Sequence, residues 1–263
     1  MADRDPVLEL HNLSVIYQNQ PALWNADFSL DGNHLVGIIG PNGSGKTTML
    51  KSIMGIIEPA SGYVKLFGKP LQEVRQRIAY VPQRGTVDWD FPINVFETVL
   101  MGRTRPNNLL KRYTKVDKEI AREAIRKVNL EAFMDRQISQ LSGGQQQRVF
   151  IARALAQEAD LYLLDEPFAG VDMATEHAII TLLQSMRDQG KTLLVVHHDL
   201  QSVSQYFDWL IMLNTRMIAA GPTQEVFVPE MLNKTYGGNL NILSEVLNLV
   251  KTYEHSLKEG QES

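Results

Sequence analysis

The most informative stretch of the sequence reads Gly40-Pro41-Asn42-Gly43-Ser44-Gly45-Lys46-Thr47-Thr48. It follows a continuous apolar run from Leu35 to Ile39, which is typical of a strand buried on both faces of a parallel sheet. It precedes a helical pattern from Lys46 to Met54. A G-x-x-x-x-G-K-T spacing between a strand and a helix predicts a phosphate-binding loop, whose backbone N–H groups and helix dipole hold phosphate oxygens. An ordinary glycine-rich turn is the alternative, but the flanking strand and helix favour nucleotide binding.

In such a loop, Lys46 is expected to reach the β- and γ-phosphates, and the Thr47 hydroxyl is expected to bind Mg²⁺. A second buried strand, Leu161 to Leu164, ends in the adjacent carboxylates Asp165 and Glu166. Because successive side chains at a strand end point in different directions, Asp165 can hold Mg²⁺ while Glu166 faces the attacking water as a base. A strand that simply ends in polar residues is the alternative, which the phosphate loop in the same chain disfavours.

A second glycine-rich segment, Leu141-Ser142-Gly143-Gly144-Gln145, precedes a helical pattern from Gln146 to Leu155. Ser142 and Gln145 have the spacing of a capping box. A capping box does not account for Gly143 and Gly144, because two glycines weaken the first turn of a helix. Close approach of a phosphate to this backbone would account for them. One chain then has two anion-binding helix starts for one nucleotide, which makes sense if a second copy supplies one of them across a two-fold axis.

The remaining pattern predicts how these motifs are arranged. The first 35 residues alternate apolar and polar positions around turn signals, which predicts a small antiparallel β layer. A helical pattern from Ala174 to Gln189 links Leu161 to Leu164 with a third buried run, Thr192 to Val196, as a βαβ unit. From about residue 85 to 155 the period is helical, with Asp117 as an expected N-cap. Short strands are expected at Trp209 to Leu213 and Met217 to Ala219.

These motifs occur in the order of the ATP-binding subunits of ABC transporters, which the chain resembles over about residues 7 to 230. The resemblance also rests on Tyr80-Val81-Pro82-Gln83, Leu161 to Pro167, Gly170-Val171-Asp172 and His197-His198-Asp199. It implies an α/β fold with a P-loop NTPase core, which is a mostly parallel sheet with flanking helices. To this core it adds an N-terminal antiparallel β layer and a helical subdomain. We expect one ABC-type ATPase domain over residues 1–263, with the helical subdomain at about 85–155.

The resemblance implies a head-to-tail homodimer that holds two ATP molecules at its interface. Each ATP is expected to lie between Lys46 of one subunit and Ser142 of the other. Residues expected to contact the nucleotide, with Mg²⁺ as the second cofactor, are Gly40, Pro41, Asn42, Gly43, Ser44, Gly45, Lys46, Thr47, Thr48, Ser142, Gly143, Gly144 and Gln145. The Mg²⁺ ligands are expected to be Thr47, Gln83 and Asp165.

The same resemblance assigns roles to four further residues. Gln83 is expected to contact Mg²⁺ and the attacking water and to sense the membrane partner, and His198 to hold the γ-phosphate. Tyr17 is expected to stack on adenine, although a lone aromatic in a strand often serves only for packing. Asp172 is expected to contact the opposite subunit. A shared metal site at His197 and His198 is disfavoured, because side chains of adjacent residues at a strand end diverge, and His197 is interpreted as a packed or solvent-facing histidine.

The segment from Gln83 to Arg103 is similar to the matching stretch of manganese and zinc uptake systems, as are Phe168 to Asp172 and His197 to Leu200. By that resemblance we expect import of a divalent transition metal, with manganese ahead of zinc and iron third. The partners would be a polytopic membrane permease and, indirectly, an extracytoplasmic metal-binding protein. Trp89 and Phe91 lie between acidic residues and fit either a surface groove for a permease helix or packing of the helical subdomain.

Composition excludes several other classes of protein. The 263 residues carry 26 basic and 30 acidic side chains, and this net charge of −4 lacks the basic excess of a nucleic-acid binder. With no cysteine, disulfides and thiolate zinc sites are excluded. No secretory signal or apolar run of about 20 residues is apparent, so we expect a soluble, cytoplasmic protein. The resemblance to ABC transporter subunits further implies a peripheral position on the cytoplasmic face of the membrane. At about 235–263, a C-terminal amphipathic helix followed by a solvated tail is expected. The helix would present its apolar side to the core or to a dimer partner, with the residues Ile242, Leu243, Val246, Leu247 and Val250.

Other functions remain open at this stage. A soluble ABC-type ATPase of iron–sulfur cluster assembly and a transporter ATPase with a different cargo would share these motifs. A non-transport nucleotide switch or a P-loop kinase is a third alternative, but a kinase would leave the Ser142-Gly143-Gly144 segment without a role. A GTPase is disfavoured because Asn233-Lys234 is followed by Thr-Tyr and lacks the Asp of a guanine-reading N-K-x-D motif.

Overall fold

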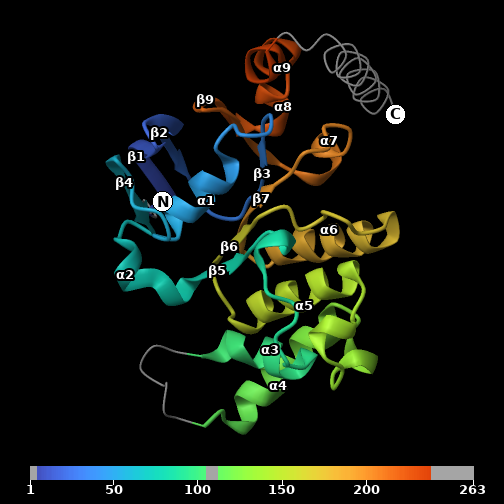
Figure 1. Ribbon diagram of the computed structural model, residues 1–263. Coiled ribbons are helices and arrows are strands. Elements are labelled where there is room, and N and C mark those ends of the chain that lie inside the picture. Colours follow the sequence, from blue (N-terminus) through green and yellow to red (C-terminus); the bar gives the residue numbers. More distant parts are fainter. Residues whose placement is uncertain (1–4, 105–111, 238–263) are drawn as a thin grey trace. The chain divides into compact units, whose positions relative to one another are not determined.

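A computed structural model describes residues 5–104 and 112–237, which divide into two compact units (Figure 1). Unit 1 combines the chain up to Leu71 with the chain from Val196 onward. Unit 2 is the intervening segment Gln72–Val195. Unit 1 therefore carries the phosphate loop, and unit 2 carries the Asp165-Glu166 pair and the Ser142 segment.

In unit 1, the strands of the sheet have the order β4-β1-β2-β9-β8-β3. They are β1 (Leu8–Tyr17), β2 (Gln20–Leu30), β3 (Leu35–Ile39), β4 (Ser61–Leu66), β8 (Trp209–Asn214) and β9 (Arg216–Pro222). The accompanying helices are α1 (Lys46–Ile53), α7 (Val203–Tyr206), α8 (Thr223–Val226) and α9 (Pro229–Tyr236). β1 is antiparallel to β2 and β4, whereas β3 is parallel to β8. The predicted antiparallel layer and the predicted strands after residue 208 are confirmed.

The strand β3 explains how the phosphate loop is supported. All five of its residues are buried, as its continuous apolar sequence predicts. A Cβ atom at Gly37, in the middle of β3, would lie 2.8 Å from side-chain atoms of both Phe207 and Leu210. The neighbouring segment therefore packs directly on the β3 backbone, which fixes the strand just before Gly40.

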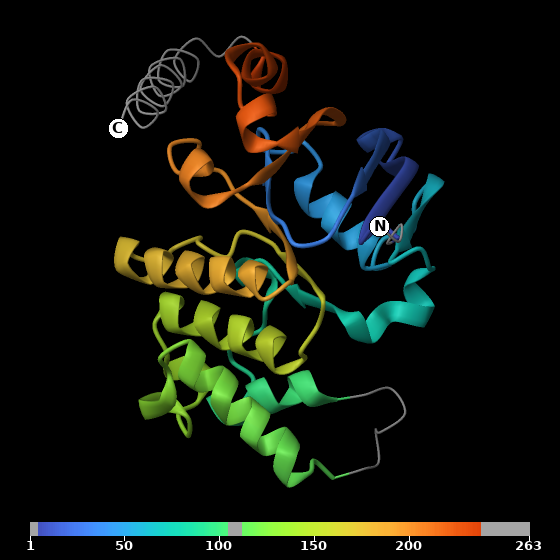
Figure 2. The same ribbon diagram turned by 180° about the vertical axis from the view of Figure 1, so that it is seen from behind.

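Unit 2 contains three parallel strands in the order β7-β6-β5. They are β5 (Ile78–Val81), β6 (Leu161–Leu164) and β7 (Thr192–Val196). The last residue of β7, Val196, already belongs to unit 1. Its longer helices are α3 (Val95–Leu100), α4 (Lys115–Lys127), α5 (Gly143–Ala156) and α6 (Met173–Asp188), and the short α2 (Leu71–Val74) starts at the boundary between the units. α5 packs beside both α3 and α4 (Figures 1 and 2). The βαβ unit β6-α6-β7 matches the prediction, and Gly190 follows α6 in a left-handed conformation.

The expected N-cap at Asp117 is wrong by three residues. α4 begins after Thr114, whose side-chain oxygen accepts a hydrogen bond from the Asp117 N–H. The Asp117 carboxylate in turn accepts one from the Thr114 N–H at 2.9 Å. Asp117 is thus the third helical residue of a reciprocal capping box, a position where an acidic side chain is also favoured.

Two expectations concern membranes and the C-terminal region. Within 5–104 and 112–237, no helix combines the length and the apolar character needed to cross a bilayer. The predicted apolar stripe from Ile242 to Val250 lies outside the described residues. The last described helix is α9, which ends at Tyr236.

Candidate active site

The phosphate loop of unit 1 requires glycine at two positions. Gly40 and Gly45 have φ angles of +154° and +97°. A Cβ atom at Gly40 would lie 2.0 Å from the Leu213 carbonyl oxygen, and one at Gly45 would lie 2.3 Å from the Ala22 carbonyl oxygen. Both the backbone conformation and the available space therefore exclude a side chain. These constraints shape the loop directly before the first turn of α1.

Lys46 is buried at the start of α1, and its Nζ atom donates hydrogen bonds of 2.9 Å to the carbonyl oxygens of Gly40 and Pro41. These bonds hold the ammonium group against the loop. The first turn of α1 has no acidic side chain that would repel an anion. The Ser44 hydroxyl is buried and has no hydrogen-bond partner among the described residues. Phosphate oxygens would accept from this donor, so the loop fits a nucleotide phosphate.

Tyr17 and His198 are both accessible in unit 1. Tyr17 ends β1 with 46% of its surface exposed, and His198 is exposed directly after β7. Neither side chain is used for core packing, so both are able to contact a ligand. The predicted residues Tyr17, Lys46 and His198 thus lie in the same unit as the phosphate loop.

His197 differs sharply from its neighbour. It is 1% exposed, its ring lies 5.3 Å from that of Phe207, and its Nε2 atom is 2.8 Å from the Ser202 hydroxyl. Burial lowers the pKa of His197 to about 4, so the ring is neutral at pH 7. Of the two interpretations of His197, packed or solvent-facing, its burial shows the packed one. Among the described residues, no cluster of three or more metal-ligating side chains occurs.

In unit 2, two of the predicted catalytic residues are in direct contact. The Gln83 amide nitrogen donates a 2.8 Å hydrogen bond to a carboxylate oxygen of Glu166, although 83 residues separate them in the sequence. Asp165 beside it is fully buried, and its carboxylate accepts a long hydrogen bond of 3.5 Å from the Tyr80 hydroxyl. Burial and the Asp165 charge raise the pKa of Tyr80, which keeps the hydroxyl protonated as a donor. The end of β6 therefore brings together oxygen atoms of Asp165 and Gln83, which suit Mg²⁺, and the Glu166 carboxylate, which can act as a base.

The capping box at the start of α5 is confirmed. The Ser142 hydroxyl accepts from the Gln145 N–H at 3.3 Å, and the Gln145 side chain accepts from the Ser142 N–H at 2.9 Å. Of the two glycines, Gly144 has ordinary space, since an added Cβ atom would lie 3.6 Å from its nearest neighbours. At Gly143 an added Cβ atom would lie 2.9 Å from Arg84 Cζ, so the guanidinium would have to shift to admit a side chain.

Arg84 is a residue of this site that the sequence did not reveal. Its Nε and Nη2 atoms donate to the Gln146 side-chain oxygen at 3.1 and 3.0 Å. This contact joins positions 62 residues apart, and no sequence spacing signals it. Nothing in the pattern around Gln83 separates Arg84 from a solvent-exposed cation.

Asp172 has a local structural role in unit 2. Its carboxylate accepts from the Thr175 N–H at 2.8 Å and from the Thr175 hydroxyl at 3.1 Å, so it caps α6. These hydrogen bonds lower the pKa of Asp172. The side chain is exposed, which leaves its outer edge accessible to another chain.

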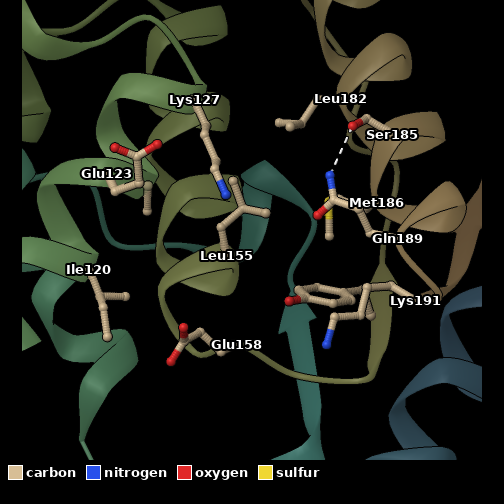
Figure 3. Close-up of a pocket in the computed structure, with 12 residues that line it drawn as sticks. Ile120, Glu123, Lys127, Leu155, Glu158, Leu182, Ser185, Met186, Gln189 and Lys191 are labelled. Carbon is tan, nitrogen blue, oxygen red and sulfur yellow. Dashed lines mark hydrogen bonds between the residues drawn. The ribbon is translucent and has the colours of Figure 1, made fainter.

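A separate cavity of about 400 Å³ lies in unit 2 among α4, α5 and α6 (Figure 3). The apolar side chains of Ile120, Leu155 and Leu182 line it together with the charged side chains of Glu123 and Lys127. None of its 12 lining residues is a predicted site residue. The cavity is therefore distinct from the motifs described above.

The fold and these motifs define an ATP-binding protein of the P-loop class. Residues 23–169 match the model of the ABC transporter family, and the chain belongs to that family. This match and the similarity to a solved ATP-binding cassette identify the chain as an ATPase of the ABC type. The predicted family and fold class are confirmed.

Two relatives indicate the branch of the family, and one solved structure is similar to the chain in fold. The chain is 54% identical to the manganese transport system ATP-binding protein MntB of Bacillus subtilis (strain 168), over 90% of this chain and 95% of that protein. It is 53% identical to the zinc transport system ATP-binding protein TroB of Treponema pallidum (strain Nichols), over 89% of this chain and 88% of that protein. A solved nucleotide-free ATP-binding cassette from an ABC transporter is similar in structure, with a TM-score of 0.74, 26% identity and coverage of 92% and 98%.

Proposed function

We propose that the protein hydrolyses ATP to power the import of a divalent transition metal, manganese ahead of zinc, through a separate polytopic permease. Its similarity to the manganese and zinc transport subunits, at 54% and 53% identity, supports this cargo class. Iron is the third choice. The protein would act at the cytoplasmic face of the membrane, and an extracytoplasmic metal-binding protein would deliver the ion to the permease.

ATP would bind with its phosphates on Gly40 to Thr48 and its adenine on Tyr17. The buried Ser44 hydroxyl and the Lys46 ammonium support phosphate binding at this loop. Thr47, Asp165 and Gln83 would hold Mg²⁺, which neutralises phosphate charge when bound. Their hydroxyl, carboxylate and amide oxygens are the donor types that this ion prefers.

The hydrogen bond between Gln83 and Glu166 is the observation that carries the proposed hydrolysis. Glu166 would accept the proton of the attacking water, and Gln83 would orient that water through the side chain that now contacts Glu166. Lys46 and His198 would stabilise the charge that develops on the γ-phosphate. Gln83 would also report the state of the permease.

Two copies would bind two ATP molecules head to tail, with Ser142, Gly143, Gly144 and Gln145 of one copy contacting the phosphates bound by the other. Asp172, whose outer edge is exposed, would contact the opposite copy. We assign residues 1–263 to one ABC-type domain, about 85–155 to a helical subdomain within it, and about 235–263 to a C-terminal helix and tail.

The cargo is tested by deleting the gene and measuring uptake of Mn²⁺, Zn²⁺ and Fe²⁺ in a strain that has no second system. Manganese accumulation and growth under manganese limitation should fall, and the wild-type gene should restore both. The Glu166→Gln gene should restore neither. Unchanged uptake of all three ions would contradict the cargo class, and an accompanying loss of iron–sulfur enzyme activity would favour the assembly ATPase.

A further inference from the structure

Arg84 is held against the beginning of α5 by its side chain. Its guanidinium donates two hydrogen bonds to the Gln146 side-chain oxygen, at 3.1 and 3.0 Å, and lies over Gly143, where an added Cβ atom would be 2.9 Å from Arg84 Cζ. The Gln146 amide nitrogen is also engaged, because it donates to the Ile138 carbonyl oxygen at 3.0 Å. Gln146 is therefore a rigid acceptor for Arg84.

The backbone of Arg84 is held to the same helix by a second route. Its carbonyl oxygen accepts a 3.0 Å hydrogen bond from the Trp89 indole N–H. The Trp89 ring packs edge-on against Phe150 of α5, with 5.0 Å between ring centroids. The turn that follows Gln83 is thus tied to α5 at both Gly143 and Phe150.

These contacts form a continuous series from Glu166, the proposed base, to Ser142 at the start of α5. Glu166 accepts from Gln83, the next residue Arg84 holds Gln146, and Gln146 lies one turn after the N-cap Ser142. A displacement of the α5 start would therefore move the backbone that presents Gln83 to Glu166.

The charge of Arg84 is placed where a purely structural residue would not be expected. A cation near a helix N-terminus opposes the helix dipole. In the described part of the chain, the Arg84 guanidinium has no carboxylate partner that would offset this cost. A phosphate at the start of α5 would offset it.

We propose that Arg84 is a positioning residue, which aligns the Gln83–Glu166 pair with the phosphate-receiving start of α5. The inference rests on the proposed ATP-bound dimer. A side chain at residue 143 would displace the guanidinium from this position. Arg84 would act through Gln83 and α5, without itself taking part in proton transfer.

The test compares Arg84→Met, which removes the charge and both hydrogen bonds, with Arg84→Lys, which keeps only the charge. Both variants should lower kcat for ATP, Arg84→Met by about 10- to 100-fold, while KM changes by less than about threefold, because Lys46 and the phosphate loop are intact. Gln146→Met should have a similar effect, and the double variant Arg84→Met/Gln146→Met should be no worse than either alone.

A second readout does not depend on turnover. In the Glu166→Gln variant, ATP with Mg²⁺ should produce dimers, which light scattering measures. Adding Arg84→Met to this variant should reduce the fraction of dimers. Arg77→Met is the matched control, because Arg77 donates to Asp160 elsewhere in unit 2 and should leave kcat unchanged.

The outcomes separate this inference from the proposed function. If Glu166→Gln alone forms no ATP-dependent dimer, the proposed dimer is wrong. If it forms dimers and Arg84→Met changes neither dimer formation nor kcat, Arg84 has no positioning role. A loss of kcat that disappears on assay well below the melting temperature would also overturn the inference, because Arg84 would then only stabilise unit 2. Should Arg84→Met fail to fold, Arg84→Lys and Gln146→Met decide the same question.

Discussion

Glu166 has an unusual backbone for a residue with a side chain. Its φ angle is +52°, in the left-handed region, and it directly follows the fully buried Asp165. Such a conformation stores about 1 to 3 kcal/mol of strain, which proteins tend to keep at functional positions. Gln83 holds the resulting side-chain direction by its hydrogen bond. The geometry therefore favours a specific chemical role for this carboxylate.

Glu166→Gln should keep ATP binding but lower steady-state ATP hydrolysis by about 100-fold or more, because an amide cannot accept the proton. It should also trap a dimer with bound ATP, measurable by light scattering. Lys46→Ala should instead weaken ATP binding itself, measured with a fluorescent ATP analogue. Nearly normal turnover in Glu166→Gln would remove Glu166 from the mechanism.

His197 should make stability depend on pH. The folded protein keeps this buried ring neutral down to about pH 4, whereas an unfolded chain protonates it near pH 6.5. As pH falls, the unfolded chain therefore binds a proton at His197 before the folded protein does. The contribution of the neutral His197 ring to the free energy of unfolding is complete above pH 6.5 and is lost as pH falls towards 4. By pH 5 the loss should reach about 2 kcal/mol in the free energy of unfolding. Urea unfolding at pH 7.5 and at pH 5 should show a smaller loss of unfolding free energy for His197→Gln than for the wild-type protein. Equal losses in the two proteins would contradict a lowered pKa of His197.

At the level of whole elements, three helices of unit 2 start with a reciprocal capping box. Asn94 and Glu97 cap α3, Thr114 and Asp117 cap α4, and Ser142 and Gln145 cap α5. Local hydrogen bonds within four residues suffice for each box, so none of the three reveals a function by itself. The difference lies in what surrounds them, since Arg84 lies against the first turn of α5.

Thr114→Ala and Ser142→Ala form a matched pair of cap deletions. Each should lower the free energy of unfolding by about 1 kcal/mol, because one helix N–H loses its partner. Only Ser142→Ala should also weaken the ATP-dependent dimer, since the Ser142 segment is proposed to contact the nucleotide of the opposite copy. Equal dimer formation in the two variants would reduce Ser142 to a structural cap.

For the whole molecule, the proposed dimer makes a prediction about mixed subunits. When Lys46→Ala and Ser142→Arg chains are combined, one of the two sites would carry both lesions and the other would carry neither. Mixed dimers should therefore retain ATP-stabilised association, whereas each variant alone should lose it. Differently tagged chains and co-purification with ATP would measure this. No association above that of the single variants would contradict completion of the site by a second copy.

Much of the fold was predictable because its signals are local. The continuous apolar runs predicted β3, β6 and β7, and the loop glycines predicted the turn before α1. The error at Asp117 arose because a capping box places suitable side chains at two positions of the same turn. A single sequence does not show which of the two is the cap.

The sequence by itself determined the phosphate loop, the paired carboxylates and the capped start of α5, since each depends on neighbouring residues and on backbone conformation. Only the tertiary structure decided that Gln83 contacts Glu166, that His197 is buried while His198 is exposed, and that the Arg84 guanidinium lies against Gly143. These contacts join residues on separate elements or depend on how whole elements pack. Long-range packing sets their geometry, and no local spacing encodes it.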